Sequence, residues 1–200
     1  MSDPAAHVVD DDAAIRDALA WLFRSRGVGA RTWESGEAFL AARPEAMSGC
    51  IVLDVRMEGM SGVEVHDQLL ARGCLMPVLF LTGHGDVPLA VGALKKGAFD
   101  FFEKPFNDNQ LVDRVLDAMR ADEALRRERA LAGDLAARLA QLTPREREVM
   151  DLVVSGEHNK GIADALSIAV RTVEVHRAHV FDKMGVRSAV ELAGLLARSR

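Results

Sequence analysis

Short apolar runs alternate with amphipathic helical patterns through the first hundred residues. The runs are rich in valine, isoleucine and leucine, which is typical of parallel strands that crossover helices cover on both faces. Strands are expected at residues 6–9, 29–33, 50–53, 78–81 and 99–102. Helices are expected at residues 13–26, 36–42, 63–71, 87–96 and from 108 onward. This order predicts one α/β domain with a five-stranded parallel sheet.

The pattern becomes purely helical after Asn107. This residue is the expected N-cap of a helix, and Phe106 and Leu111 are spaced as a hydrophobic staple. Residues 113–142 are rich in Ala, Leu, Arg and Glu, with no stop signal before Gly133. The sequence therefore predicts an extended helical linker. Its leucines have mixed helical spacings, so either they pack on the protein's own domains or they form a coiled-coil dimer seam.

The last part of the chain predicts a small all-α module. The stretch Thr143-Pro144-Arg145-Glu146 reads as a capping box with proline at the first helical position, and Gly156 as a stop. Further helices are expected at 160–166 and 171–184, and a fourth is capped by Ser188 with Glu191. The predicted organisation is an α/β domain at 1–119, a helical linker at 120–142 and a four-helix domain at 143–200.

Charge and cysteine content narrow the class of protein. Residues 1–104 carry 10 basic and 15 acidic side chains, whereas residues 143–200 carry 9 and 8, within a net charge of -5. The acidity therefore belongs to the first domain, and the near-neutral tail points only weakly to DNA. The two cysteines, Cys50 and Cys74, are isolated, which favours a reducing compartment. No signal peptide or membrane span is evident, so a cytoplasmic location is expected.

Polar side chains that can take part in a reaction or bind a metal lie at the ends of four of the predicted strands. Asp10 and Asp11 follow the first strand, Asp54 the third, Thr82 ends the fourth, and Lys104 follows the fifth. The carboxyl ends of the strands of an open parallel sheet form its ligand crevice. These five side chains are therefore expected to converge.

Clustered carboxylates at such a crevice suit Mg²⁺, which prefers oxygen ligands and brings phosphate with it. With the metal bound, Asp54 is the expected nucleophile toward a phosphoryl group, Asp10 and Asp11 hold the metal, Lys104 pairs with the charge and Thr82 donates to the phosphoryl oxygens. A single aspartate at a strand end is ordinarily a cap or turn residue. Only the set of five is specific.

Four stretches resemble the receiver domain of the FixJ subfamily of response regulators: His7-Val8-Val9-Asp10-Asp11-Asp12, Val52-Leu53-Asp54-Val55-Arg56-Met57, Leu81-Thr82-Gly83-His84-Gly85-Asp86 and Phe101-Phe102-Glu103-Lys104-Pro105-Phe106. The resemblance covers residues 1–119 and implies a flavodoxin-like sheet of order 2-1-3-4-5. It implies that Asp54 accepts a phosphoryl group from a sensor histidine kinase. It also implies Mg²⁺ ligation by Asp11, Asp54 and the main-chain carbonyl of Arg56, with Asp10 nearby, an aromatic switch at Phe101 and a cis Lys104-Pro105 bond.

Glu58 departs from the family pattern. Family members commonly carry proline at this position, four residues after Asp54. Glutamate frees the loop backbone and adds a negative charge near the site, so that phosphorylation or dephosphorylation rates are expected to differ. A solvated loop residue is the alternative interpretation.

Residues 143–196 resemble a LuxR-type helix-turn-helix domain. The stretches Leu142-Thr143-Pro144-Arg145-Glu146-Arg147-Glu148-Val149, Asn159-Lys160 and Arg171-Thr172-Val173-Glu174-Val175-His176-Arg177 carry this resemblance. Helical packing predicts that Val173, Val180, Phe181 and Met184 enter the core. By position in the family, Glu174, Val175 and Ala178 lie against base edges. Phosphate contacts are expected from Lys160, Arg171, Thr172, Arg177 and Lys183.

The turn before the expected recognition helix also departs from the family. This chain has Ser167 and Ala169 where the family often has Gly and Ser. Loss of an N-cap serine typically costs a helix about 1 kcal/mol. The module is therefore expected to bind DNA but to be less stable than its relatives.

The sequence thus predicts a transcriptional regulator, not an enzyme. Phosphorylation of Asp54 is expected to promote a homodimer through the fourth helix, fifth strand and fifth helix, which then binds paired half-sites in double-stranded DNA. RNA polymerase is a further expected partner. The alternatives are a Mg²⁺-dependent phosphohydrolase that uses Asp54 transiently, and a DNA-binding protein that works without phosphorylation.

Overall fold

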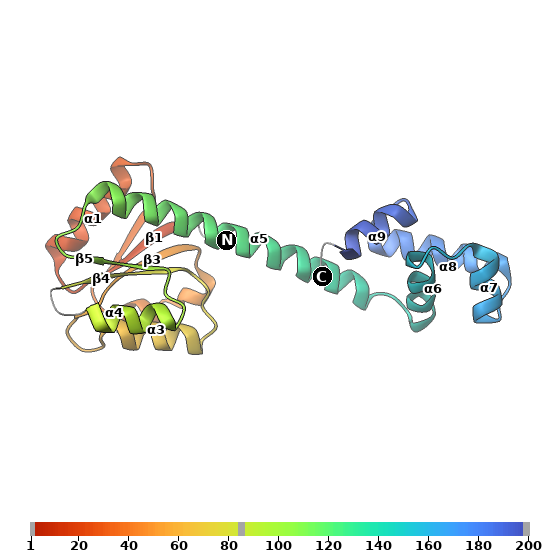
Figure 1. Cartoon of the computed structure of the whole chain (residues 1–200), viewed down its shortest axis with the longest axis horizontal. Coiled ribbons are helices and arrows are strands. Elements are labelled where there is room, and N and C mark those ends of the chain that lie inside the picture. The colour runs from red at the N-terminus through yellow and green to blue at the C-terminus, as the bar shows by residue number, and fades with distance from the viewer. Residues whose placement is uncertain (1–2, 84–86, 198–200) are drawn as a thin grey trace. The chain divides into compact units, whose positions relative to one another are not determined.

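The computed structural model describes residues 3–83 and 87–197. The chain divides into two compact units, Met1–Arg126 and Arg127–Arg200 (Figure 1). The first is an α/β unit and the second is helical. In the described part of the chain, no helix is apolar over the length that a bilayer requires.

The first unit contains a five-stranded parallel sheet of order β2-β1-β3-β4-β5, which confirms the predicted topology (Figure 1). The strands are β1 Ala5–Val9, β2 Ala30–Trp33, β3 Gly49–Asp54, β4 Val78–Thr82 and β5 Asp100–Glu103. The connecting helices are α1 Ala13–Ser25, α2 Gly36–Ala41, α3 Gly62–Ala71 and α4 Val87–Lys95, with a short 3-10 turn at Pro44–Ala46. Helix α5, Asp108–Ala140, follows β5. All bounds lie within two residues of the predicted ones where both ends were predicted.

Helices cover both faces of the sheet, as the continuous apolar strands require. One core cluster joins the sheet to α1 and α5 through residues such as Phe23, Leu111 and Val115. The other joins it to α2, α3 and α4 through residues such as Phe39 and Val65. The strand register pairs Val9 with Leu53, Asp54 with Leu81 and Thr82 with Glu103, so the carboxyl ends of β1, β3, β4 and β5 lie level with one another.

Helix α5 begins where the sequence predicted and continues past Gly133. The Asn107 side chain accepts a hydrogen bond from the main-chain N–H of Gln110 at 3.1 Å. Residues near each end of the helix are buried in their own unit, whereas residues 127–134 are exposed and Leu131 is 64% exposed. The leucine pattern is therefore explained in part by packing within each unit, and the coiled-coil seam stays a prediction.

A buried carboxylate ties α5 to the start of β3. Asp122 is 2% exposed and accepts from the main-chain N–H of Gly49 at 2.8 Å and from Arg126 Nε at 2.7 Å. Arg126 also donates to the main-chain carbonyl of Met47. The first unit thus includes Asp122 and Arg126, which the sequence assigned to the linker.

Replacing Asp122 with alanine is expected to lower the free energy of unfolding of the first unit by about 2 kcal/mol, because the Gly49 N–H and the Arg126 guanidinium lose their partner. Both tryptophans, Trp21 and Trp33, lie in this unit, so tryptophan fluorescence during urea unfolding reports on it alone. Glu123→Ala, an exposed change on the same helix, is the control and should shift stability by less than about 0.5 kcal/mol. Equal losses for the two variants would contradict the role of Asp122.

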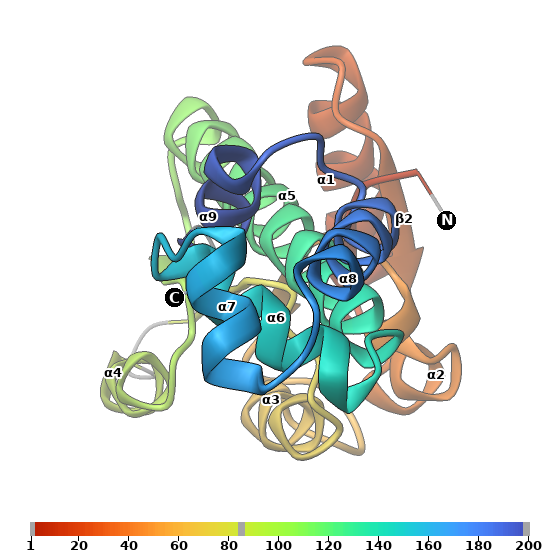
Figure 2. The ribbon, with the colours of Figure 1, turned by 90° about the vertical axis from the view of Figure 1, so that its right-hand side faces the viewer.

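The second unit carries four described helices after α5: α6 Pro144–Val154, α7 Asn159–Leu166, α8 Val170–Met184 and α9 Ala189–Ala197 (Figure 2). The capping box of Thr143 and Glu146 is present as predicted. Val173, Val180 and Met184 are fully buried in the shared core, as predicted. Phe181 is only half-buried, and the guanidinium of Arg177 lies over its ring at 5.5 Å.

The turn between α7 and α8 is strained at the position where the sequence departs from its family. Ser167 adopts the left-handed conformation, with φ 52° and ψ 49°, and Ala169 provides no side-chain cap for α8. A side chain in this conformation costs roughly 1–2 kcal/mol, and glycine avoids that cost but loses more entropy on folding.

Ser167→Gly is therefore expected to stabilise the second unit by about 0.5–1 kcal/mol. Calorimetric unfolding of the full chain, with hydrogen exchange at α7 and α8, measures this change. The control is Ser155→Gly, because Ser155 ends α6 with an ordinary right-handed φ of -73°. That variant should destabilise, and a gain in both variants would show that strain at Ser167 is not the cause.

Candidate functional sites

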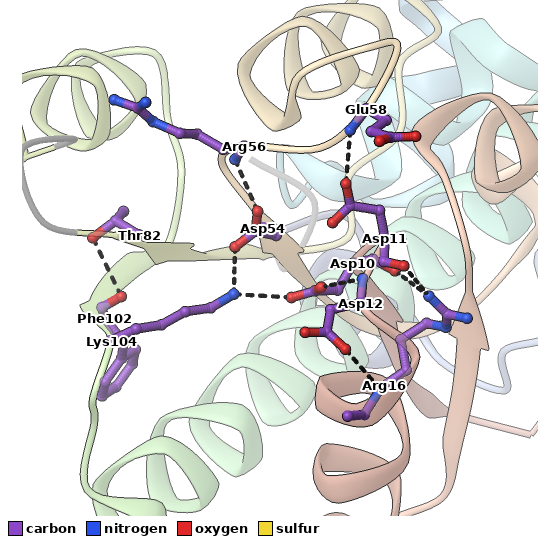
Figure 3. Close-up of polar contacts among 11 residues, drawn as sticks. Asp10, Asp11, Asp12, Arg16, Asp54, Arg56, Glu58, Thr82, Phe102 and Lys104 are labelled. Atoms are coloured by element: carbon purple, nitrogen blue, oxygen red, sulfur yellow. Dashed lines mark hydrogen bonds and ion pairs between the residues drawn. The ribbon is translucent and has the colours of Figure 1, made fainter.

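The carboxylate cluster lies at the carboxyl edge of the sheet, as the sequence predicted (Figure 3). The structure brings Asp10, Asp11, Asp54 and Lys104 together from the ends of β1, β3 and β5. Thr82 ends the neighbouring strand β4. This edge is level because the strands are in parallel register, so residues far apart in sequence meet here.

Lys104 is the cation of the cluster. Its Nζ lies 2.6 Å from Asp54 Oδ1 and 3.0 Å from Asp10 Oδ2, and the two aspartate side chains are 8% and 2% exposed. Burial raises the pKa of Asp54, the Lys104 ammonium opposes that rise, and the Asp10 charge adds to it. Burial works to lower the pKa of Lys104, but the hydrogen bonds and charges of Asp54 and Asp10 outweigh it and raise that pKa. Lys104 is therefore positively charged at neutral pH.

Main-chain N–H groups orient each of the three carboxylates. Asp54 Oδ2 accepts from the N–H of Arg56 at 2.9 Å, and Asp10 Oδ1 accepts from that of Asp12, also at 2.9 Å. Asp11 Oδ2 accepts from the N–H of Glu58 at 2.8 Å. These donors come from the two loops that follow β1 and β3 (Figure 3). The two loops together thus hold all three carboxylates.

Two residues that the sequence analysis did not single out hold the loop after β1. Arg16 Nη1 donates to the main-chain carbonyls of Asp10 at 2.8 Å and Asp11 at 2.9 Å. Asp12 accepts from the N–H of Ala14 at 2.8 Å and so caps α1. The cap had a signal, an aspartate directly before an amphipathic helix. Arg16 had none, since a helical arginine is ordinarily a solvated charge.

Thr82 and Phe101 occupy the positions that the sequence indicated, without a contact that assigns their roles. Thr82 is buried, and its hydroxyl donates to the main-chain carbonyl of Phe102 at 3.4 Å (Figure 3). Phe101 is half-buried against the core cluster of α2, α3 and α4. The Lys104-Pro105 bond is cis, as the resemblance implied.

The site offers a small number of protein oxygens of the kind that Mg²⁺ binds. Within the described residues, no group of three or more His, Cys, Asp or Glu side chains is arranged to hold a metal ion, and Lys104 contacts both Asp10 and Asp54. The set that the resemblance implies, Asp11, Asp54 and the main-chain carbonyl of Arg56, would supply two carboxylates and one carbonyl. Mg²⁺ uses one or two carboxylates and keeps several waters for exchange with phosphate oxygens.

In the second unit, α8 presents the side chains that the sequence assigned to DNA. Thr172, Glu174, Val175 and Ala178 are exposed, and Val175 is a large apolar side chain at 45% exposure. Arg171 is exposed and pairs with Glu174 at 3.2 Å. Lys160 is exposed near the start of α7. The exposed surface of α8 is therefore a mixed polar and apolar one that can face the base edges of a major groove.

Lys183 has a partner that the sequence did not predict. Its Nζ lies 2.6 Å from Oε2 of Glu146, which is 3% exposed, and His179 Nδ1 lies 3.5 Å from Oε1. The hydrogen bonds from Lys183 and from the Thr143 N–H lower the pKa of Glu146 to about 2. This pair joins α8 to α6. The contact of Lys183 with a DNA phosphate stays a proposal, and in the structure Lys183 is paired with Glu146.

Comparisons with known proteins identify the family of each unit. The family model described as response regulator receiver domain matches residues 6–116, and the model described as bacterial regulatory proteins, luxR family, matches residues 140–196. The chain is 55% identical to the C4-dicarboxylate transport transcriptional regulatory protein DctR of Rhodobacter capsulatus, over 94% of this chain and 96% of that one. It is 47% identical to the transcriptional regulatory protein FixJ of Bradyrhizobium diazoefficiens, over 96% and 94%. The solved structure of the response regulator StyR matches with a TM-score of 0.93 and 39% identity, over 98% and 100%. The chain therefore belongs to the response regulators that join a receiver domain to a LuxR-type DNA-binding domain.

Proposed function

We propose that Asp54 accepts a phosphoryl group from a sensor histidine kinase and that this modification controls the binding of α8 to DNA. The observation that carries the proposal is the contact of one ammonium, that of Lys104, with two nearly buried carboxylates, those of Asp10 and Asp54. A nucleophilic carboxylate that faces a phosphoryl group needs such a cation at its side.

The geometry supports a simple transfer step. An oxygen of Asp54 attacks the phosphorus, and the bond from phosphorus to the donor breaks. The Arg56 N–H fixes one oxygen of Asp54 and Lys104 contacts the other, so the carboxylate is oriented before the donor arrives. Mg²⁺, held by Asp11, Asp54 and the main-chain carbonyl of Arg56 with Asp10 nearby, would offset the negative charge of the phosphoryl group.

Phosphorylation turns the singly charged Asp54 carboxylate into an acyl phosphate, which increases the negative charge beside Thr82 and Lys104. In this proposal the Thr82 hydroxyl leaves the Phe102 carbonyl to donate to the phosphoryl oxygens, and the neighbouring Phe101 changes its packing. The described part of α4 exposes Leu89 at 50% and Val91 at 40%, which supports a dimer through α4, β5 and α5. Exposed apolar side chains of this kind favour burial against a second copy.

A dimer brings two copies of α8 to DNA. Phosphorylation would therefore raise the affinity of the protein for paired half-sites. Glu174, Val175 and Ala178 are the proposed contacts to base edges. Lys160, Arg171, Thr172, Arg177 and Lys183 are the proposed contacts to phosphates. The bound regulator would then act on transcription, with RNA polymerase as a further partner.

A phosphohydrolase is the rival function. The apolar character of a groove beside the site argues against it. The groove has a volume of about 580 Å³ and is lined by residues of α1, including Trp21 and Leu22, and by Lys104, Pro105, Phe106 and Asp108. Of the described residues that line it, Lys104 is the one cation. An apolar groove of this kind does not favour the binding of small phosphate esters, which need several polar donors.

The test is selection of DNA from a pool of random duplexes, with and without acetyl phosphate and Mg²⁺, by the parent chain and by Asp54→Ala. The expected result is an enriched palindrome that depends on the donor and on Asp54. Equal enrichment in all samples would leave DNA binding without the switch. No enrichment, together with turnover of a small phosphate ester, would favour the hydrolase.

A further inference from the structure

The loop between β3 and α3 supplies two main-chain donors to the carboxylate site. Arg56 donates to Asp54 and Glu58 donates to Asp11. We propose that the main-chain N–H of Glu58 positions Asp11 for metal binding and thereby sets the Mg²⁺ affinity of the receiver. This inference rests on the metal site of the proposed function.

The contact joins two loops that are far apart in the sequence. The Glu58 nitrogen lies 2.8 Å from Asp11 Oδ2, and the two residues are 47 positions apart. Asp11 is exposed, so tight packing does not fix its rotamer. Arg16 holds the main chain of Asp11 through its carbonyl, and Glu58 holds the carboxylate (Figure 3). The main chain and the carboxylate of Asp11 are therefore both held by residues that are not themselves metal ligands.

Such a bond is compatible with metal binding. Each carboxylate oxygen has two lone pairs, so Asp11 can accept from Glu58 and still offer lone pairs to a cation. Mg²⁺ tolerates little departure from octahedral geometry, which makes the prior orientation of each ligand valuable. Groups that hydrogen-bond to a metal ligand typically change metal affinity by about 10–100-fold when they are removed.

Glu58 contributes two separable features to the site. One is its N–H, which every residue except proline provides. The other is its exposed side chain, which adds negative charge beside the site. Proline at this position removes both features, whereas glutamine removes only the charge. These two variants therefore distinguish a positioning role of the main chain from an electrostatic role of the side chain.

The experiment is titration calorimetry of Mg²⁺ binding to the full-length parent chain, Glu58→Pro and Glu58→Gln. We expect Glu58→Pro to bind Mg²⁺ about tenfold more weakly than the parent. Glu58→Gln should stay within about threefold of the parent, because an exposed charge contributes little. Equal weakening in both variants would overturn the proposal. No Mg²⁺ binding by the parent would instead count against the proposed function.

A second measurement covers the case in which the proline variant is misfolded, which tryptophan fluorescence would show. Amide hydrogen exchange at Glu58 is measured by NMR in the parent and in Asp11→Ala. We expect exchange of this amide to be about tenfold faster once its acceptor is gone. The same exchange rate in both chains would mean that the hydrogen bond does not position Asp11, and the proposal would fail.

Discussion

Replacement of Lys104 by methionine is expected to slow the phosphorylation of Asp54 by about 100-fold or more. The ammonium contacts both Asp54 and Asp10, and its raised pKa keeps it charged at neutral pH. Without it, the two nearly buried carboxylates lose the ammonium that contacts both of them, and the charge that develops on the phosphoryl oxygens loses a donor. Removal of one such donor typically costs about 100–1,000-fold in rate. Methionine keeps the length and apolar character of the lysine stem.

The measurement is the rate at which full-length protein is phosphorylated by acetyl phosphate at saturating Mg²⁺, followed on phosphate-affinity gels. Lys104→Arg is the matched variant, because it keeps the charge but replaces a compact ammonium by a planar fork. Its rate should lie between those of the parent and Lys104→Met. A methionine variant within a few-fold of the parent rate would show that Lys104 only neutralises the free site.

The fold of the first unit could be predicted because its strands carry a strong and simple pattern. Every residue of β1, β3 and β4 is buried, and the sequence shows these strands as short, mostly apolar runs. The edge strand β2 also lies where the alternating pattern predicted it, although Arg31 and Thr32 within it are exposed.

The site residues differ in how visible they are in the sequence. Asp10, Asp54 and Lys104 are visible as members of a set, because together with Asp11 and Thr82 they lie at the carboxyl ends of four predicted strands. Arg16 and Asp122 look like ordinary solvated charges on helices, and Glu146 is visible only as a capping-box residue. The packing shows that each one holds two segments together. The contact of the Glu58 N–H could not be predicted from side-chain types, because this group belongs to the main chain. Long-range polar contacts of this kind depend on the tertiary structure.

Loss of the Glu146 side chain is expected to destabilise the second unit strongly. This side chain is 3% exposed, and it accepts from Lys183 at 2.6 Å and from the Thr143 N–H at 2.8 Å. Glu146→Ala leaves the ammonium of Lys183 and the N-terminus of α6 without this partner. The expected loss in the free energy of unfolding is about 3 kcal/mol. Glu148→Ala is the control, because Glu148 pairs with Arg145 on the exposed surface of the same helix and should contribute less than about 1 kcal/mol.

The effect of Glu146 also has a definite dependence on pH. The folded pKa is about 2, below the ordinary value of 4.5, so the carboxylate binds a proton less readily in the folded state than in the unfolded state. Its contribution is therefore fully present above pH 4.5 and is lost as the pH falls through about 2. The difference in stability between the parent and Glu146→Ala should shrink across that window.

Tryptophan fluorescence does not report on the second unit, since both tryptophans lie in the first. Calorimetry and hydrogen exchange of peptides from α6 and α8 measure its stability instead. If the contact joins the two helices, exchange in both should accelerate in Glu146→Ala, and Lys183→Met should reproduce the change in α8 without adding to it in the double variant. Additive effects of the two substitutions, or a stability difference that stays flat as the pH is lowered, would mean that the pair does not hold α8 on α6.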